Sequence, residues 1–237
     1  MWSLVLPFHS DFQRLHSTLL LLSREKEPYG IKEVLLCHNG PRLKPEIERS
    51  LIELAVQNQA LYFHTDRKGI GAGYRLGIQN AEQPYCLLSA SDLPFGFSDL
   101  DSFYEHGCTS QETPSLAIGS KAHRATSFEG LSPKRRVASW AFFVLRRLLL
   151  GRETPRDTQG TILIATGLAR ELIPHCRYDD FFFSVEIITL AQRRGVSVVE
   201  LPVRVGRWSG ASSVSVVCDG WRMARRLVEL SRRSGTA

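Results

Sequence analysis

A single carboxylate, Asp92, follows an apolar run typical of a buried strand in the stretch YCLLSASDLP, residues 85–94. Many α/β enzymes hold a metal ion or a phosphate group at such a strand exit. A divalent cation usually needs more than one fixed oxygen ligand, and the residue two positions before Asp92 is Ala90. The pattern therefore predicts either a metal site with one protein carboxylate or a site in which fixed cations neutralise the phosphates.

A glycine-rich stretch, KGIGAGYRLG at 68–77, is the second candidate element. Lys68 beside the free backbone N–H groups of a helix start would suit a diphosphate. A dinucleotide fingerprint, G-x-G-x-x-G, would follow the first strand, whereas here Tyr74 occupies the sixth position and the element follows the third predicted strand. The spacing disfavours a nicotinamide cofactor and leaves two interpretations, a diphosphate site or close packing of a helix on a sheet.

Arginine-rich segments at 132–140, 144–152 and 221–235 give the 237-residue chain a formal net charge of +6. Such clusters face phosphorylated ligands, anionic lipid or nucleic acid, or form solvated helix faces. We expect phosphorylated ligands and no nucleic acid. Five scattered cysteines without a C-x-x-C pair argue against zinc and a disulfide framework and suit a reducing cytosol.

The elements that must position these residues alternate along the first part of the chain. Strand-like runs lie at 3–8, 32–40, 60–66 and 85–92, and segments of helical period lie at 11–25, 44–58 and 71–82. This alternation predicts an open, mainly parallel sheet. Since such sheets bind ligands at the carboxyl ends of their strands, four segments should meet at one crevice. These segments are 7–11, 37–41, 66–73 and 89–94.

The rest of the chain predicts a second set of elements. Strands are expected within 114–121, 157–166 and 196–205, and helices over 132–151, 181–195 and 219–233, the last capped by Asp219. Asp179 and Asp180 are interpreted as capping residues ahead of a helix rather than as metal ligands. We find no linker or internal repeat, and the longest apolar stretches fall short of the ~20 residues that span a bilayer. One domain over 1–237 is therefore expected.

Eight motifs follow one another along the chain: LPFHSD, EVLLCHNGP, RKGIGAGYRLGIQNA, YCLLSASDLP, AIGSK, DTQG, FFFSVEIITLAQRRG and VELPVRV. In this order they resemble family 2 glycosyltransferases of the GT-A fold, most closely the branch that makes dolichyl- or polyprenyl-phosphate sugars. The resemblance runs from about residue 2 to residue 230. It implies a Rossmann-like open sheet flanked by helices, with a nucleotide-binding half at about 1–95 and an acceptor-side half at about 96–237.

The resemblance implies a nucleotide-sugar site in the first half. Two of the family's acidic motifs are changed here, because His38 and Asn39 replace two aspartates and Ala90 replaces the first acid of the Asp-x-Asp metal motif. Without the family context, the turn at 38–40 would need no function. The residues carried over as nucleotide-sugar-binding are Pro7, His9, Asp11, His38, Asn39, Lys68, Gly69 and Asp92.

Sugar transfer from a nucleotide diphosphate leaves negative charge that the site must neutralise. One route is Mg²⁺ or Mn²⁺ held by Asp92, since magnesium often uses only one or two protein carboxylates. The other route uses fixed cations, and arginine binds a diphosphate through two parallel hydrogen bonds. The resemblance implies a phosphate-binding set of Lys121, Arg135 and Arg136, to which Lys68 and Arg124 add charge.

The catalytic residues implied by the resemblance lie in two segments of the second half. DTQG retains Asp157 and Gln159, and FFFSVE retains Glu186 but has Ser184 where an aspartate is common. A phosphate acceptor is already ionised and needs little help from a base. For a hydroxyl acceptor, Glu186 or Asp157 would be the general base.

We therefore expect an inverting glycosyltransferase that moves a sugar from a nucleotide-diphosphate donor to a lipid-phosphate or hydroxyl acceptor. Two alternatives stay open: a non-catalytic nucleotide-sugar-binding or partner protein of the same fold, and a transferase for a soluble natural-product acceptor. The C-terminal helix sets Trp221, Ala224, Leu227 and Val228 on one side and arginines on another, which would suit an anionic membrane surface or packing on the sheet. The expected location is cytoplasmic, or peripheral at the membrane.

Overall fold

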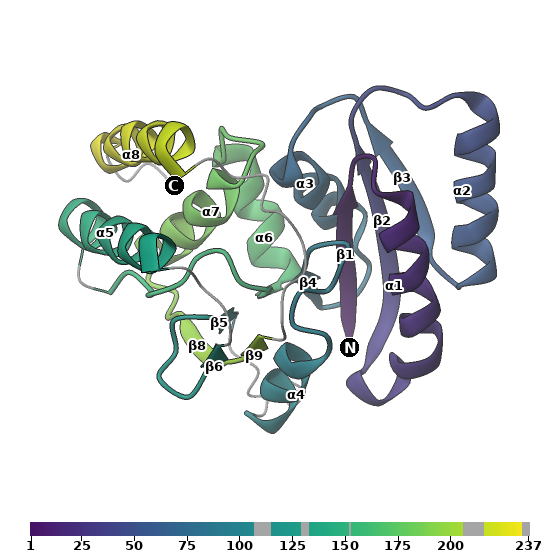
Figure 1. The fold of residues 1–237 in the computed structure, drawn as a ribbon, viewed down its shortest axis with the longest axis horizontal. Helices are drawn as coiled ribbons and strands as arrows, with labels where there is room; N and C mark the ends of the chain where they lie inside the picture. The colour runs from purple at the N-terminus through teal and green to yellow at the C-terminus, as the bar shows by residue number, and fades with distance from the viewer. Residues whose placement is uncertain (107–114, 129–132, 152, 206–215, 234–237) are drawn as a thin grey trace.

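The computed structural model describes residues 1–106, 115–128, 133–151, 153–205 and 216–233 (Figure 1). Within these ranges the side chains at 127–128, 133–136, 205 and 216–219 are not described. A seven-stranded sheet lies at the centre. In spatial order its strands are β3 (Leu61–Thr65), β2 (Ile31–Asn39), β1 (Trp2–Phe8), β4 (Tyr85–Leu88), β7 (Ile162–Ala165), β5 (Leu116–Ser120) and β8 (Val199–Pro202).

The four strands expected to end at one crevice run parallel. β1 pairs with β2 on one side and with β4 on the other, and β2 pairs with β3. β7 is antiparallel to both of its neighbours, β4 and β5, while β8 is parallel to β5. The prediction of an open, mainly parallel α/β sheet is confirmed, and the carboxyl ends of β1 to β4 share one edge.

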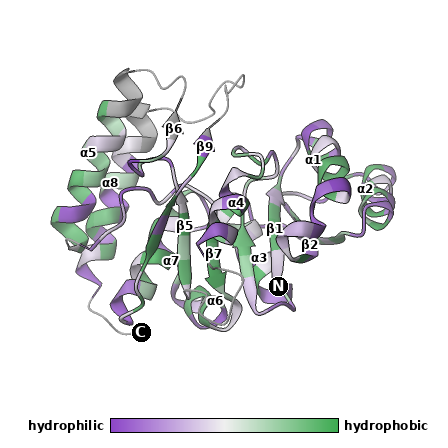
Figure 2. Ribbon diagram, turned by 90° about the horizontal axis from the view of Figure 1, so that it is seen from below, coloured by the Kyte–Doolittle hydropathy of each residue, from purple (hydrophilic) through white to green (hydrophobic). Residues whose placement is uncertain are grey.

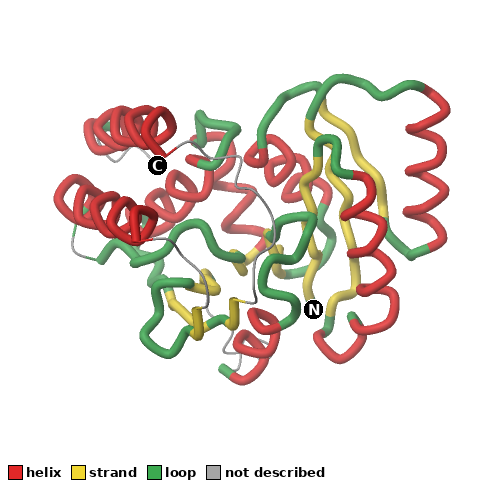
Figure 3. The backbone as a smooth tube through the Cα atoms, viewed as in Figure 1, coloured by secondary structure: helices red, strands yellow, loops and turns green. Residues whose placement is uncertain are grey.

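Helices flank the sheet, as the tube in Figure 3 shows. They are α1 (Phe12–Glu25), α2 (Pro45–Gln57), α3 (Ile70–Asn80), α4 (Ser98–Glu105), α5 (Pro133–Leu150), α6 (Thr166–Leu172), α7 (Phe182–Arg193) and α8 (Val216–Arg232). Short 3₁₀ turns lie at Glu27–Tyr29 and Ile173–His175, and β6 (Ser127–Phe128) pairs with β9 (Arg204–Val205). The sequence pattern predicts neither α4 nor α6. The prediction of Asp219 as a helix cap is wrong, because α8 begins at Val216.

Alternate residues of β1 enter two separate cores, because successive side chains of a strand point to opposite faces of the sheet. Leu4 and Leu6 pack with residues of α1, α2 and α4, whereas Val5 packs with residues of α3, α6 and α7. Hydrophobic residues accordingly dominate the central strands in Figure 2. The two layers of helices hold the sheet, and hence the strand ends, in place.

Glycines let α3 lie very close to β1. A Cβ atom at Gly73 would be 2.4 Å from Pro7 Cβ, and one at Gly77 would be 2.1 Å from Val5 Cγ1. Neither position accepts a side chain without movement of the strand. The glycine-rich stretch thus has the packing function that was one of its two interpretations, and Pro7 is buried beneath α3.

A third core joins α5, α7 and α8 at the end of the molecule away from α2 (Figure 1). Phe182 and Val185 of α7 meet Leu227 and Leu230 of α8, and partly buried residues of α5 pack against them. α8 therefore packs on two helices rather than directly on the sheet.

Asp99, in the first turn of α4, is a buried carboxylate that gives the fold a pH dependence. It accepts hydrogen bonds from the Thr161 hydroxyl and from the N–H of Leu100 (2.9 Å), and burial raises its pKa to about 6. The unfolded chain releases this proton near pH 4, so the folded state loses relative stability as the pH rises from about 4 to 6. We expect Asp99→Asn to remove up to about 3 kcal/mol of that loss.

Urea unfolding of wild type and Asp99→Asn at several pH values measures this effect. As the pH rises from about 4 to 6, the unfolding free energy of wild type should fall relative to that of Asp99→Asn. A constant difference between roughly pH 4 and pH 7 would show that Asp99 does not titrate as described.

Candidate functional site at the strand ends

Planar rings form a row across the carboxyl ends of β1, β2 and β3. Phe8 lies opposite His38 in the strand register, and His38 lies opposite His64. The centroid of the His38 ring is 5.3 Å from that of Phe8, 5.1 Å from that of His64 and 6.4 Å from that of His9. Phe8 and His38 are buried, whereas His9 is exposed, so His9 provides the flat surface that suits stacking against a nucleobase.

His38 is the buried centre of this row. Its pKa is lowered by burial first and by the neighbouring His64, so the imidazole is neutral near pH 7. Its Nδ1 lies 3.4 Å from the Tyr62 hydroxyl, and its Nε2 has no hydrogen-bond partner among the described atoms.

His9 and Asn39 meet beside His38. His9 Nδ1 donates to the backbone carbonyl of Asn39 at 3.0 Å. A Cβ atom at Gly40 would be 2.3 Å from the same nitrogen, so glycine is needed for this close approach. The structure thus brings together three of the residues expected near the nucleoside, from the ends of two strands.

Arg14 contacts both acidic residues that were predicted at this site, Asp11 and Asp92. Asp11 caps α1 by accepting from the backbone N–H of Arg14 (3.2 Å), and its carboxylate lies 3.1 Å from Arg14 Nε. Arg14 Nη1 lies 3.7 Å from the carboxylate of Asp92. Asp11 and Asp92 therefore face one guanidinium, which the sequence reasoning missed.

The backbone at Asp179 packs against the first turn of α3. Gly69 has a φ of +112°, and the N–H of Ala72 donates to the carbonyl of Asp179 at 3.1 Å. Cβ atoms at Gly69 and Gly71 would lie 2.2 Å and 2.9 Å from that carbonyl oxygen. Lys68 is exposed beside this contact. A diphosphate at this helix start would meet Lys68, with part of the backbone donor set already used.

Asp179 and Asp180 tie this loop to its surroundings. Asp179 pairs with Arg67 at 2.6 Å and with Arg75 at 3.4 Å. Asp180 accepts from the N–H of Phe182 at 3.0 Å and pairs with Arg226. The N-cap of α7 is Phe181, so Asp180 lies one residue ahead of the cap and accepts from the first N–H of the helix, while Asp179 serves as an ion-pair partner.

Asp157 and Lys121 lie at the centre of the group predicted for the acceptor side. The buried carboxylate of Asp157 accepts from the backbone N–H groups of Lys121 (2.9 Å) and Gln159 (2.8 Å). Lys121 Nζ lies 3.9 Å from the same carboxylate and donates to the carbonyl of Gln159 at 3.2 Å. Lys121 Nζ also lies 5.9 Å from the centre of the Phe95 ring, in the segment that follows Asp92. This contact joins the two predicted groups.

Glu186 is fully buried, and both of its oxygens are engaged. One accepts from the N–H groups of Arg177 (2.7 Å) and Tyr178 (3.1 Å), and the other pairs with Arg233 of α8. Glu186 therefore fixes the loop that also carries Asp179. That loop meets Gln159, whose side-chain amide donates to the carbonyl of Phe181 at 3.0 Å.

Two further residues, Glu200 and Arg146, contact the segment that carries Asp157 and were not predicted from the sequence. Glu200 accepts from the N–H groups of Arg156 (2.8 Å) and Asp157 (3.1 Å). Buried Arg146 donates to the carbonyl of Arg156 at 2.8 Å, and burial lowers its pKa to about 10 although Asp157 and Glu200 oppose the shift. Both residues hold the turn that presents Asp157. The side chains of Arg135 and Arg136 lie outside the described residues.

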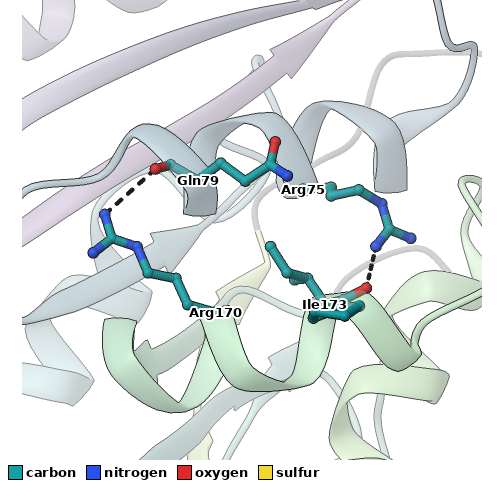
Figure 4. A pocket seen from close by; sticks show the side chains of 5 residues that line it. Arg75, Gln79, Arg170 and Ile173 are labelled. Atoms are coloured by element: carbon teal, nitrogen blue, oxygen red, sulfur yellow. Dashed lines mark hydrogen bonds between the residues drawn. The ribbon is translucent and has the colours of Figure 1, made fainter.

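A hollow of about 430 Å³ lies elsewhere, between α3 and α6 (Figure 4). The two arginines that line it already donate hydrogen bonds to backbone carbonyls. Arg170 donates to the carbonyls of Ile78 and Ala81 at the end of α3, and Arg75 donates to those of Ile173 and Cys176. The hollow contains none of the predicted site residues.

In the described part of the chain, no cluster of three or more His, Cys, Asp or Glu side chains is arranged to hold a metal ion. The described helices are also each too short or too polar to cross a membrane.

Comparison with solved structures identifies the fold. The chain aligns with glucosyl-3-phosphoglycerate synthase of Mycobacterium tuberculosis bound to uridine diphosphate, with a TM-score of 0.65 and 15% identity over 98% of this chain and 78% of that one. The same enzyme with Mn²⁺, UDP-glucose and glycerol 3-phosphate gives a TM-score of 0.64 and 14% identity over 97% and 78%. The chain has the GT-A glycosyltransferase fold.

Sequence relatives of this glycosyltransferase fold agree with that result. A dolichyl-phosphate β-glucosyltransferase of Saccharomyces cerevisiae is 25% identical, over 95% of this chain and 72% of the relative. The enzyme of the same name from Dictyostelium discoideum is 24% identical, over 98% and 74%. No protein-family model matches the chain. The predicted similarity to dolichyl-phosphate sugar transferases is confirmed.

Proposed function

We propose that the protein is an inverting glycosyltransferase that moves a sugar from a nucleotide diphosphate to a phosphorylated acceptor, a lipid phosphate above all. The observation that carries this proposal is the meeting of the ring row, Asp11 and Asp92 at one edge of a GT-A sheet, beside the Asp157 group. The relatives are named for transfer to dolichyl phosphate, and the structural neighbour was solved with UDP-glucose and a phosphorylated acceptor.

The position of each residue indicates its role in binding the substrates. His9 offers an exposed ring surface to the base, with buried His38 behind it. Lys68 lies where the diphosphate would approach α3, and Lys121 offers a cation between the two groups. Asp157 holds Lys121 in place, and each of its oxygens accepts a backbone N–H. Glu186 acts by fixing the loop at 177–181, because neither of its oxygens is free to meet a substrate.

A divalent metal was present with the structural neighbour, which was solved with Mn²⁺ or Mg²⁺. In this chain the corresponding donor set is poor. Asp92 is the carboxylate at the strand exit, Ala90 offers no oxygen side chain, and Arg14 lies 3.7 Å from Asp92. A divalent cation at Asp92 would have to compete with this guanidinium for the carboxylate. These residues do not fit a resident metal, and we assign no step to one.

A membrane surface is the second part of the proposal. Trp140 of α5 and Trp221 of α8 are 66% and 78% exposed, on two helices that pack side by side (Figure 1). Exposed arginines, Arg147 and Arg225, lie on the same helices. Indole rings among cations favour the interface of an anionic bilayer. Of the apolar side predicted for α8, Leu227 is buried against α7 and Trp221 faces outward.

Replacing both tryptophans by serine is expected to weaken binding to phosphatidylserine vesicles by roughly tenfold. Sedimentation with vesicles measures the bound fraction, and Val56→Ser is the matched control because Val56 is an exposed apolar residue of the distant helix α2. Equal sedimentation of wild type and the double variant would contradict the membrane role of this pair.

Transfer itself is tested with radiolabelled UDP-glucose and polyprenyl phosphate. The proposal expects labelled lipid in the organic phase, with the anomeric configuration opposite to that of the donor. Labelled water-soluble product from a phosphorylated small molecule would instead indicate a soluble acceptor. Binding of UDP-glucose without turnover of any acceptor would favour the second candidate, a non-catalytic nucleotide-sugar-binding protein, which the replacement of the paired acids by Ala90, His38 and Asn39 supports.

A further inference from the structure

Arg14 has a fixed place between two carboxylates at the entrance to the strand-end site. It is the third residue of α1, and Asp11 holds both its backbone N–H (3.2 Å) and its Nε (3.1 Å). One helical turn further, the Thr18 hydroxyl donates to the carbonyl of Ser91 at 2.8 Å. This second contact fastens α1 to the segment that carries Asp92, so the 3.7 Å approach of Arg14 to Asp92 is set by the fold.

Asp11, Arg14 and Asp92 together carry a formal net charge of −1, so an anionic ligand here depends on direct hydrogen bonds from the guanidinium. Asp11 and Asp92 are each near Arg14, and a metal ion at Asp92 would have to displace the guanidinium or bear its repulsion. The side chain of Arg14 remains half-exposed, so N–H groups that do not face the two carboxylates are open to a ligand. A diphosphate can accept such groups in pairs.

We propose that Arg14 takes the place of the divalent cation at the donor diphosphate, so that nucleotide binding depends on this guanidinium and not on a metal ion. The inference rests on the proposed function, because it concerns the same donor site. Asp11 and Asp92 then act as positioning residues that aim the guanidinium. The loss of an acid at position 90 fits this arrangement, since two free carboxylates would favour a metal that competes with the arginine.

Calorimetric titration with UDP tests the proposal on the full chain. Wild type, Arg14→Gln, Arg14→Lys and the control Arg24→Gln are each titrated in EDTA and in Mn²⁺. Arg24 is an exposed residue of the last turn of the same helix. Thermal unfolding of all four proteins checks that the folds are equal.

Wild type and Arg24→Gln should bind UDP with the same Kd in both buffers. Arg14→Gln should bind about tenfold more weakly in EDTA, and Mn²⁺ should restore part of the affinity because Asp92 is then free of the guanidinium. Arg14→Lys should fall between them, since an ammonium group lacks the planar fork.

Two results overturn the proposal and separate it from the function. Wild type that binds UDP only with Mn²⁺, or Arg14→Gln that binds as wild type in EDTA, would refute the role of Arg14 while leaving a nucleotide-sugar site. Wild type that binds no UDP in either buffer would refute the role of Arg14 and count against the donor site as a whole.

Discussion

Replacing Asp157 by asparagine is expected to lower the turnover of sugar transfer by about 100-fold or more, with little change in the affinity for the donor. The carboxylate is buried, accepts from two backbone N–H groups and faces the ammonium of Lys121. Asparagine keeps the shape but removes the charge and turns an N–H₂ group toward one of these donors. Lys121 then loses its ion-pair partner, and its hydrogen bond to the carbonyl of Gln159 is left to hold it next to the Phe95 segment.

Initial rates with UDP-glucose and polyprenyl phosphate measure the loss in kcat. Glu153→Gln is the matched control, because Glu153 is an exposed carboxylate on the same segment. It should retain the wild-type rate. If Asp157→Asn turns over at more than half of the wild-type rate, Asp157 is outside the catalytic group and the acceptor side must be sought elsewhere.

Glu186→Leu is expected to lower the free energy of unfolding by roughly 3–5 kcal/mol, because it leaves a buried charge and buried donors without partners. Glu186 is fully buried and holds Arg233 together with the N–H groups of Arg177 and Tyr178. Urea unfolding followed by circular dichroism measures the change.

A double-variant cycle separates the energy of the ion pair from the other effects of leucine at position 186. Glu186→Leu with Arg233→Leu should be less destabilised than the sum of the two single variants, because the second change removes the unpaired cation. Glu171→Gln is the control, since Glu171 pairs with Arg194 at 2.7 Å on the surface and should cost at most about 1 kcal/mol. If Glu186→Leu lowers the free energy of unfolding by less than about 1 kcal/mol, Glu186 is not a structural carboxylate and becomes a candidate catalytic residue again.

Much of the fold follows from local pattern. The strands from β1 to β4 are mainly apolar runs of four to nine residues between polar turns. Their parallel order follows from the helices that separate them. The antiparallel direction of β7 has no local signal, because it depends on how the chain returns after α5. Short α4 and α6 carry too few turns for a clear helical period.

The site was less predictable, because its key contacts join residues distant in sequence. Arg14 looked like one more surface arginine of an amphipathic helix, and its meeting with Asp92 appears only when α1 packs beside the end of β4. Glu186 and Glu200 likewise gain their partners from other elements. His9 and His38 of the ring row were predicted as nucleotide-binding residues. His64 was not predicted, because it reaches His38 only through the pairing of β2 with β3.

Hydrogen–deuterium exchange with and without UDP-glucose shows whether the ends of β1 to β4 form the donor site. Donor binding there should slow exchange in segments 9–14, 38–40, 66–72 and 89–95 and leave exchange unchanged beside the hollow between α3 and α6. Protection confined to residues 75–79 and 170–174, with the strand ends unchanged, would contradict it.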